Sequence, residues 1–374
     1  MAQTHSAKIC LVGDMLAHGG AERAHAALSR YFAGTGIEVH NVIVQDVIAY
    51  SYTGELLNLG KEKDDANGFT NKFRRLRILR SYVKRHRFDY IIDFRMRRKP
   101  LQDWLISKFV FTVPTIYTVR SSNIDWYMPR RSWVTRAIYG KSYGVVALND
   151  KMKRHIEKCH GLKNVATIYN PIDAEYIAAR LHKSPPTEAF RYIIAAGRLS
   201  DDNVKQFDKL IEAYAVSELP SNNVRLMILG QGVLLAKLQK LADGLGLQDK
   251  IVFKGYQENP YVYMRDALFF VLSSRFEGMP NVVLESLACG TPVVAFDCFT
   301  GPSEIIEDGR NGLLIKDQDF AELTKGINRM YDDNALYARC KANAAGSIEK
   351  FSLENVGQAW LDYLKIKANG YSNY

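Results

Sequence analysis

The sequence predicts an α/β protein built from two doubly wound domains, each a parallel sheet covered by helices. The chain has 374 residues, about twice the length at which one hydrophobic core stops growing. Short apolar runs alternate with helical patterns along nearly all of it, as parallel sheets with crossover helices require. Hydrophobic residues make up 47% and charged residues 24%, the proportions of an ordinary globular protein.

The first predicted domain covers residues 1–181. Apolar runs define its strands, and apolar residues at helical spacing define its helices. We expect strands at 8–13, 38–45, 89–94, 115–119, 144–148 and 165–169, and helices near 20–33, 72–86, 100–109, 131–141 and 150–158. The polar stretch 182–187 contains a pair of prolines and indicates a linker.

The second predicted domain covers residues 190–350 and begins with RYIIAAGR at 191–198. Further strands are expected at 224–229, 251–255, 268–272 and 292–296. The last segment, 351–374, carries apolar residues at helical spacing and no following strand. It predicts a helix that packs back on the protein.

Composition excludes several classes of protein. Five scattered cysteines without CxxC spacing favour neither a disulfide framework nor a zinc site. The first residues hold an apolar run too short for a signal peptide, and no run of about 18 apolar residues follows. We expect a cytoplasmic protein that does not span a membrane.

Positive charge is concentrated at 72–99, where twelve Lys or Arg stand against Asp89 and Asp93, a balance of +10. Apolar residues recur there at helical spacing, with most cations on the other side, as in a basic amphipathic helix. Two interpretations remain open: a solvated charged face, or a surface for anionic lipid headgroups or phosphorylated acceptors. Nucleic acid is not expected, because no binding motif accompanies the charge.

The segment 273–297, SSRFEGMPNVVLESLACGTPVVAFD, is the most informative. A strand leads into a short polar loop, and Pro280 then marks the start of a helix. The free N–H groups at that start suit a diphosphate, and Gly278 lets the backbone approach it closely. These N–H groups belong to Asn281, Val282 and Val283.

Two carboxylates flank this helix start: Glu277 in the loop and Glu285 on the second turn. Carboxylates accept hydrogen bonds from vicinal hydroxyls, so one can hold a sugar ring and the other a ribose. Two glutamates at this spacing are also common as surface charges. The surrounding strand, glycine and proline favour a site.

Cations and glycines mark two more strand ends. Gly197 and Arg198 end the first strand of the second domain, and Lys205 lies near the next helix. Such cations can neutralise a diphosphate leaving group, although Lys205 alone could equally be a surface residue. In the first domain Gly19 and Gly20 precede a helix, which favours an anion site or simply a tight turn.

Together, GGAER (19–23), Arg198 with Lys205, EGMPNVVLE (277–285) and GTPVV…GPSEII (290–306) resemble family 4 of the retaining glycosyltransferases, over nearly the whole chain. The pair of glutamates in EGMPNVVLE is the specific part. The resemblance implies a GT-B fold, in which two Rossmann-like domains face each other across a cleft. It also implies a nucleotide-diphospho-sugar donor held mainly by the C-terminal domain, and no metal or other cofactor.

The resemblance implies a role for each motif residue. Arg198 and Lys205 would contact the diphosphate, Glu277 the donor-sugar hydroxyls and Glu285 the ribose. The remaining donor-side residues are Gly197, the backbone groups of Gly278, Met279, Pro280, Asn281 and Val282, and Gly20 from across the cleft, with Gly19 on the acceptor side. Tyr256, after the strand at 251–255, is either a nucleobase neighbour or a packing residue. The helix start at 301–304 is assigned a packing role.

Two features depart from the family pattern. Arg120, in PTIYTVRSSN, stands where many members have a histidine, and the spacing from Arg198 to Lys205 is longer than usual. Arg120 stays protonated and cannot act as a base. We expect it to steady a phosphate or an anionic acceptor.

The expected function is transfer of a hexose or N-acetylhexosamine, with retention, from a UDP-sugar to a lipid-linked or polysaccharide acceptor. The acceptor hydroxyl would attack from the front face, while the departing phosphate takes its proton. The protein would work at the inner face of the cytoplasmic membrane. The alternatives are a catalytically silent nucleotide-sugar-binding protein and a nucleotide-sugar epimerase of the same fold.

Overall fold

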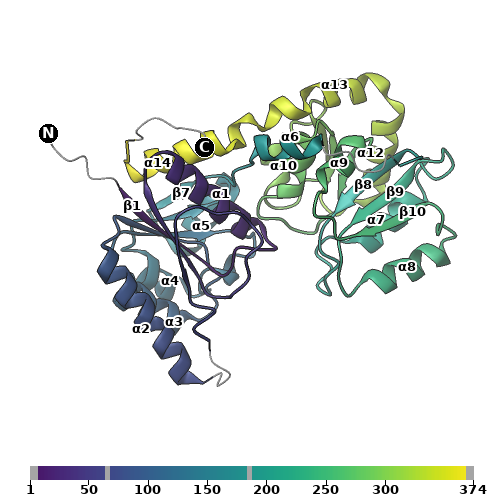
Figure 1. Cartoon of the computed structure of the whole chain (residues 1–374). Helices are drawn as coiled ribbons and strands as arrows, with labels where there is room; N and C mark the ends of the chain where they lie inside the picture. Colours follow the sequence, from purple (N-terminus) through teal and green to yellow (C-terminus); the bar gives the residue numbers. More distant parts are fainter. Residues whose placement is uncertain (1–6, 64–67, 183–187, 368–374) are drawn as a thin grey trace. The chain divides into compact units, whose positions relative to one another are not determined.

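The computed structural model describes residues 7–63, 68–182 and 188–367 (Figure 1). Contacts divide the chain into two compact units. The first unit joins Met1–Pro171 with Leu353–Tyr374, and the second unit is Ile172–Ser352.

The first unit contains a seven-stranded parallel sheet in the order β3-β2-β1-β4-β5-β6-β7. Its strands are β1 (Lys8–Gly13), β2 (Glu38–Ile43), β3 (Glu55–Asn58), β4 (Tyr90–Asp93), β5 (Thr115–Val119), β6 (Gly144–Ala147) and β7 (Val165–Thr167). Its central strands are buried on both faces, which explains why they appear in the sequence as continuous apolar runs.

Helices cover both faces of this sheet (Figure 1). They are α1 (Gly20–Gly34), α2 (Phe69–His86), α3 (Pro100–Leu105), α4 (Ser132–Tyr139), α5 (Asp150–His160) and α14 (Leu353–Leu364). Helix α3 continues into a π-helical turn, η1 (Ile106–Val110), and the 3-10 turn η2 (Ile124–Trp126) precedes α4. Helices α1 and α14 lie on one face, and α2, α3 and α4 lie on the other.

The C-terminal helix α14 packs back on the first unit, as predicted. Its buried Trp360 and Leu364 join a core with Phe32 of α1 and the apolar residues of β1. The hydroxyls of Tyr90 and Tyr143 donate to the backbone carbonyls of the last turn of α14, both at 2.8 Å. The helix therefore completes a core whose strands come from the other end of the chain.

The second unit contains a six-stranded parallel sheet in the order β10-β9-β8-β11-β12-β13. Its strands are β8 (Tyr192–Ala196), β9 (Arg225–Leu229), β10 (Ile251–Gly255), β11 (Phe270–Leu272), β12 (Val293–Phe296) and β13 (Gly312–Ile315). Its helices are α6 (Ala174–Leu181), α7 (Phe207–Ala215), α8 (Leu235–Gly244), α9 (Tyr261–Asp266), α10 (Asn281–Ala288), α11 (Pro302–Ile305), α12 (Phe320–Asp332), α13 (Asn334–Ala344) and the 3-10 turn η3 (Ala345–Phe351).

The prediction of two doubly wound parallel sheets is confirmed, with two strands missed. Both of them, β3 and β13, are edge strands of four residues. Their sequences, ELLN and GLLI, hold only two and three successive apolar residues, which is a weak signal from which to predict a strand.

The contacts place the boundary between the units at Pro171 rather than at 181. Helix α6, which was not predicted, packs against α9 and α10 of the second unit. The first unit resumes at Leu353, close to the predicted start of the C-terminal helix. Of the predicted linker at 182–187, residues 183–187 lie outside the described residues.

Candidate functional site

The predicted site residues of the second unit follow β8 and β11 at the switch point of its sheet. The chain runs from β8 through β9 to β10 on one side of β8 and then crosses back to β11 on its other side, so the direction of the strand order reverses at β8. In doubly wound sheets, ligands bind at the carboxyl ends of the strands where this reversal occurs. The loops 197–206 and 273–280 follow these two strands, and Arg198, Lys205 and Glu277 lie on them.

Lys205 and Glu277 form an ion pair, with 2.6 Å between Lys205 Nζ and Glu277 Oε1. Their side chains are 21% and 14% exposed, which shields the pair from solvent. The two loops are tied together at the backbone: Ser273 Oγ donates to the Lys205 carbonyl at 2.7 Å, and the Arg275 N–H donates to the Val204 carbonyl at 2.8 Å. The structure thus brings together two predicted site residues that are 72 positions apart.

Gly197 makes room for the side chain of Lys205. A Cβ at Gly197 would lie 2.8 Å from Lys205 Cε and 3.0 Å from its Cγ. Gly230, with φ +137, packs on the Gly197 carbonyl so closely that a Cβ there would lie 1.8 Å from the oxygen. The absence of a side chain at Gly197 thus leaves room for Lys205 to reach Glu277, and contact of Gly197 with the donor stays a prediction. Arg198, the next residue, is exposed.

Helix α10 begins at Asn281, with Pro280 as its N-cap residue in extended backbone. Met279 and Pro280 are buried, whereas Asn281 and Val282 are partly exposed. Glu285 lies on the second turn, and only 4% of it is exposed. Carboxylates are rarely buried to that extent, so the interpretation of Glu285 as an ordinary surface charge is wrong.

A third loop, after β12, supports the loop that carries Glu277. The Thr300 hydroxyl donates to the backbone carbonyl of Glu277. Gly301 has φ +103, and a Cβ there would lie 2.7 Å from Pro280 Cδ and 3.2 Å from the Gly278 carbonyl oxygen. Sequence reasoning gave the helix start at 301–304 a packing role but missed Thr300. Its position in the loop after the strand next to β11 could have indicated it.

Tyr256 follows β10, the edge strand of this sheet, and its side chain is exposed. Strand β9 separates β10 from β8. Contact with a nucleobase therefore stays a prediction.

In the first unit, Gly19 is the N-cap of α1 and Gly20 is its first residue, as predicted. A Cβ at Gly19 would lie 2.0 Å from Glu22 Oε2. The carboxylate of Glu22 thus lies against the helix start, where a carboxylate is favoured by the exposed N–H groups. An anionic ligand at Gly19 and Gly20 would have to displace it.

Arg120 follows β5 and is buried. Its Nη1 donates to Asn170 Oδ1 at 2.5 Å, and its guanidinium lies 4.6 Å from the ring centroid of Phe94. Among the described residues, neither Nε nor Nη2 has a hydrogen-bond partner, and both atoms are buried. Burial lowers the pKa of Arg120 to about 10, so it is charged at neutral pH. A buried cation with unused donors is suited to bind an anionic ligand group.

Sequence reasoning missed a buried ion pair at the end of β4. Arg95 donates two hydrogen bonds to the carboxylate of Asp93, both at 2.9 Å. Arg97, also buried, donates to the Thr118 carbonyl at 2.7 Å. The sequence signal was the segment DFRMR, in which two arginines closely follow a carboxylate at the end of a buried strand. Arg95 and Arg97 therefore do not belong to the exposed positive charge of 72–99.

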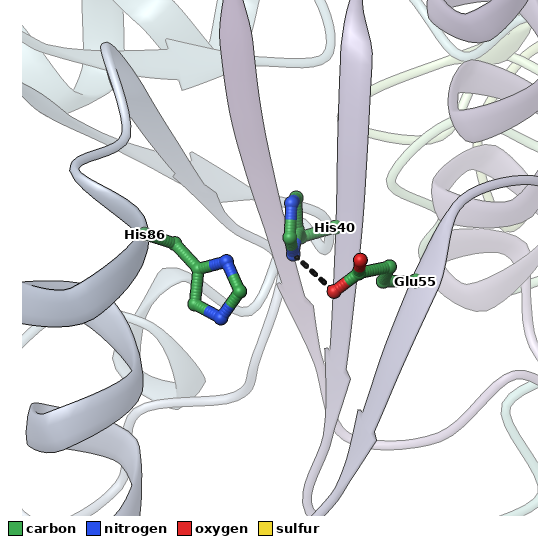
Figure 2. A group of neighbouring side chains, drawn as sticks. All are labelled: His40, Glu55 and His86. Atoms are coloured by element: carbon green, nitrogen blue, oxygen red, sulfur yellow. Dashed lines mark ion pairs between the residues drawn. The ribbon is translucent and has the colours of Figure 1, made fainter.

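Among the described residues, one group could offer a metal three ligands: His40 of β2, Glu55 of β3 and His86 of α2 (Figure 2). It lies at the outer edge of the first sheet. Both ring nitrogens of His40 already have protein partners, Nε2 with Glu38 at 2.9 Å and Nδ1 with the hydroxyl of Tyr82 at 2.6 Å. We interpret the group as a set of structural contacts that join β2, the edge strand β3 and α2.

The chain matches family models over most of its length. Residues 18–176 match the model "Glycosyltransferase Family 4", and residues 178–346 match "Glycosyl transferases group 1". The chain belongs to the glycosyltransferases. In this glycosyltransferase, the Lys205–Glu277 pair, Gly197 and α10 lie within the group 1 region, whereas α1 and Arg120 lie within the family 4 region.

A relative from Campylobacter jejuni, N-acetylgalactosamine-N,N'-diacetylbacillosaminyl-diphospho-undecaprenol 4-alpha-N-acetylgalactosaminyltransferase, is 34% identical over 202 residues, 54% of each chain. The glycosyltransferase thus spans about half the length of the curated relatives it matches.

Solved structures confirm the GT-B fold class. A glycosyltransferase from Rickettsia africae has a TM-score of 0.78 at 16% identity, covering 96% of this chain and 98% of that one. HepE of Anabaena, in complex with UDP, has a TM-score of 0.75 at 18% identity, covering 96% and 99%. Within the described ranges, every helix is too short or too polar to cross a bilayer.

Proposed function

We propose that this glycosyltransferase moves a hexose or N-acetylhexosamine from a UDP-sugar to a lipid-linked or polysaccharide acceptor in cell-surface glycan synthesis. The observation that carries the proposal is the shielded Lys205–Glu277 pair at the switch point of the second sheet. The names of the relatives support its two substrates: a diphospho-undecaprenol-linked acceptor for the Campylobacter protein and UDP for HepE.

In the proposed mechanism, Arg198 and Lys205 neutralise the diphosphate as its charge develops. Glu277 fixes the ammonium group of Lys205 and accepts hydrogen bonds from hydroxyls of the donor sugar. The N–H groups at the start of α10 face the phosphates, and Glu285 accepts from the ribose. These groups act by positioning and by charge, and we propose that the reaction requires no metal.

The transfer retains the anomeric configuration in this proposal. The acceptor oxygen forms its bond to the anomeric carbon on the face from which the diphosphate departs. The acceptor proton passes to the departing phosphate oxygen, so UDP leaves without a covalent sugar–protein intermediate. The protein supplies orientation and excludes water.

Arg120 is proposed to bind an anionic group of the acceptor, such as its phosphate. Its buried and unused Nε and Nη2 support this role. Arg120→Gln should raise KM for a phosphorylated acceptor more than KM for the donor, whereas Arg120→Lys should retain part of the affinity. Equal changes in both KM values in steady-state kinetics would contradict acceptor binding.

The deciding experiment is release of free nucleotide from UDP-, GDP- and ADP-sugars, with and without membrane-lipid extract and with and without EDTA. Release from a UDP-sugar that rises with extract, persists in EDTA and falls in Glu277→Ala is expected, and NMR of the product should show the donor's anomeric configuration. Donor conversion without an acceptor would indicate an epimerase. Binding without release would indicate a silent nucleotide-sugar-binding protein.

A further inference from the structure

Helix α3 and its π-helical turn expose apolar side chains and bury a carboxylate. Leu101 is 73% exposed and Phe109 is 50% exposed, whereas Asp103 is only 7% exposed. Asp103 accepts a hydrogen bond from the Lys99 N–H at 3.2 Å, and burial raises its pKa to about 6. A helix on the surface of a soluble domain normally has the opposite arrangement. The outward side of α3 therefore suits an apolar environment.

Neighbouring helices extend this apolar surface. Trp104 and Leu105 are exposed on α3, Phe73 on α2 and Trp133 on α4. Helix α2 contacts the π-helical turn and α3 contacts α4, and all lie on the same face of the first sheet (Figure 1). We call the set the apolar face: Phe73, Leu101, Trp104, Leu105, Phe109 and Trp133.

Cations border the apolar face. Helix α2 contains seven Lys or Arg and no Asp or Glu. Arg77, Arg80 and Lys84 are exposed and follow Phe73 at helical spacing, so they lie on the same side of α2. Lys108 is exposed within the π-helical turn itself.

We propose that the apolar face docks on an anionic lipid bilayer. Its aromatic and aliphatic side chains would enter the headgroup region, and the cations of α2 would contact lipid phosphates. This combination of Trp, Phe and Leu with Lys and Arg is typical of surfaces that lie in a membrane interface.

Charge favours a bilayer over a second copy of the chain. A symmetric dimer through this face would bring two cationic helices together, and like charges at an interface oppose association. The choice of a lipid partner rests on the proposed function in one respect, because a lipid-linked acceptor would be presented at a membrane surface.

Flotation with phosphatidylcholine vesicles, with and without phosphatidylglycerol, tests the proposal without any donor or acceptor. Arg77→Glu/Arg80→Glu/Lys84→Glu should reduce binding to anionic vesicles on the order of a hundredfold, since each cation near such a surface contributes severalfold. Leu101→Ser/Trp104→Ser/Phe109→Ser should reduce it at least about tenfold. Val216→Ser/Val233→Ser removes two exposed apolar residues of the second unit and should bind as wild type does.

Unchanged vesicle binding by the Leu101/Trp104/Phe109 variant would overturn the proposal. So would a wild-type protein that binds no vesicles but forms a dimer, if the same variant is monomeric. Thermal unfolding checks each variant, and Leu101→Ser alone is the milder substitute if the triple variant is unfolded. Transfer to a water-soluble acceptor analogue separates the two proposals. A variant that no longer binds vesicles should keep this transfer activity. If the wild type binds vesicles but transfers no sugar, the proposed function is refuted and the proposed membrane docking is not.

Discussion

At the scale of single residues, the site depends on how Lys205 is held. Its ammonium group pairs with Glu277, and its aliphatic stem crosses Gly197 at the end of β8. A flexible lysine is thereby restricted to one position, which would lower the entropy lost in the proposed binding of a diphosphate.

Lys205→Ala should lower kcat for nucleotide release by about 10²- to 10³-fold, as loss of other electrostatic anchors does. Steady-state kinetics with saturating donor measures this. Lys209→Ala is the matched control, because Lys209 pairs with Glu212 on the exposed side of α7. A rate in Lys205→Ala equal to that of Lys209→Ala would remove Lys205 from the mechanism.

Gly197→Ala and Gly230→Ala should separate activity from stability. The new methyl at Gly197 meets the flexible side chain of Lys205, so we expect a large loss of kcat with little change in Tm. At Gly230 it would meet the Gly197 carbonyl at a positive φ, so Tm should fall. Calorimetry and kinetics on both variants test this pair, and equal Tm losses would contradict it.

At the scale of elements, α1 carries a buried histidine that links stability to pH. His25 stacks on Phe94 at 5.3 Å and its Nε2 lies 3.1 Å from Asn41 Oδ1. Burial lowers its pKa from 6.5 to about 4. The unfolded chain therefore takes up this proton at a higher pH than the folded protein does, which opposes folding as the pH falls.

The contribution of His25 to the free energy of unfolding is fully present above pH 6.5 and is lost between 6.5 and about 4. The loss should amount to about 3 kcal/mol. Urea unfolding at a series of pH values measures it, with His25→Gln expected to show a flatter profile. His155→Gln, an exposed histidine, should leave the wild-type profile unchanged. An identical profile for His25→Gln would assign the acid sensitivity to other groups.

At the scale of the whole molecule, the first unit is assembled from both ends of the chain. Trp360 of α14 is fully buried in a core made by β1, α1 and their neighbours. Residues 172–352, in contrast, form a unit with its own core. Damage to α14 should therefore affect one unit only.

Trp360→Ala should destabilise the first unit by about 3–5 kcal/mol through the cavity it leaves. In calorimetry, one unfolding transition should move to lower temperature while the other stays. Binding of UDP, proposed to belong to the second unit, should persist. Lys365→Ala serves as the surface control at the end of α14. A shift of both transitions by Trp360→Ala would show that the two units unfold together.

The sequence by itself determined the two parallel sheets, the loops at their strand ends and where along these loops and helix starts the predicted site residues lie. These features are local: apolar periodicity, a glycine or proline at a strand end and a helix start are all visible within short segments. The central strands were therefore found, and Glu277 and Glu285 were placed correctly around the start of α10.

Only the tertiary structure decided which distant residues meet. Lys205 and Glu277 are 72 positions apart, and the boundary at Pro171 depends on what α6 packs against. Burial of Arg95 and Arg97 and the outward apolar residues of α3 are likewise set by neighbours from other elements. The sequence pattern gives the spacing of side chains along an element. The surroundings of each side chain depend on contacts that only the folded chain creates.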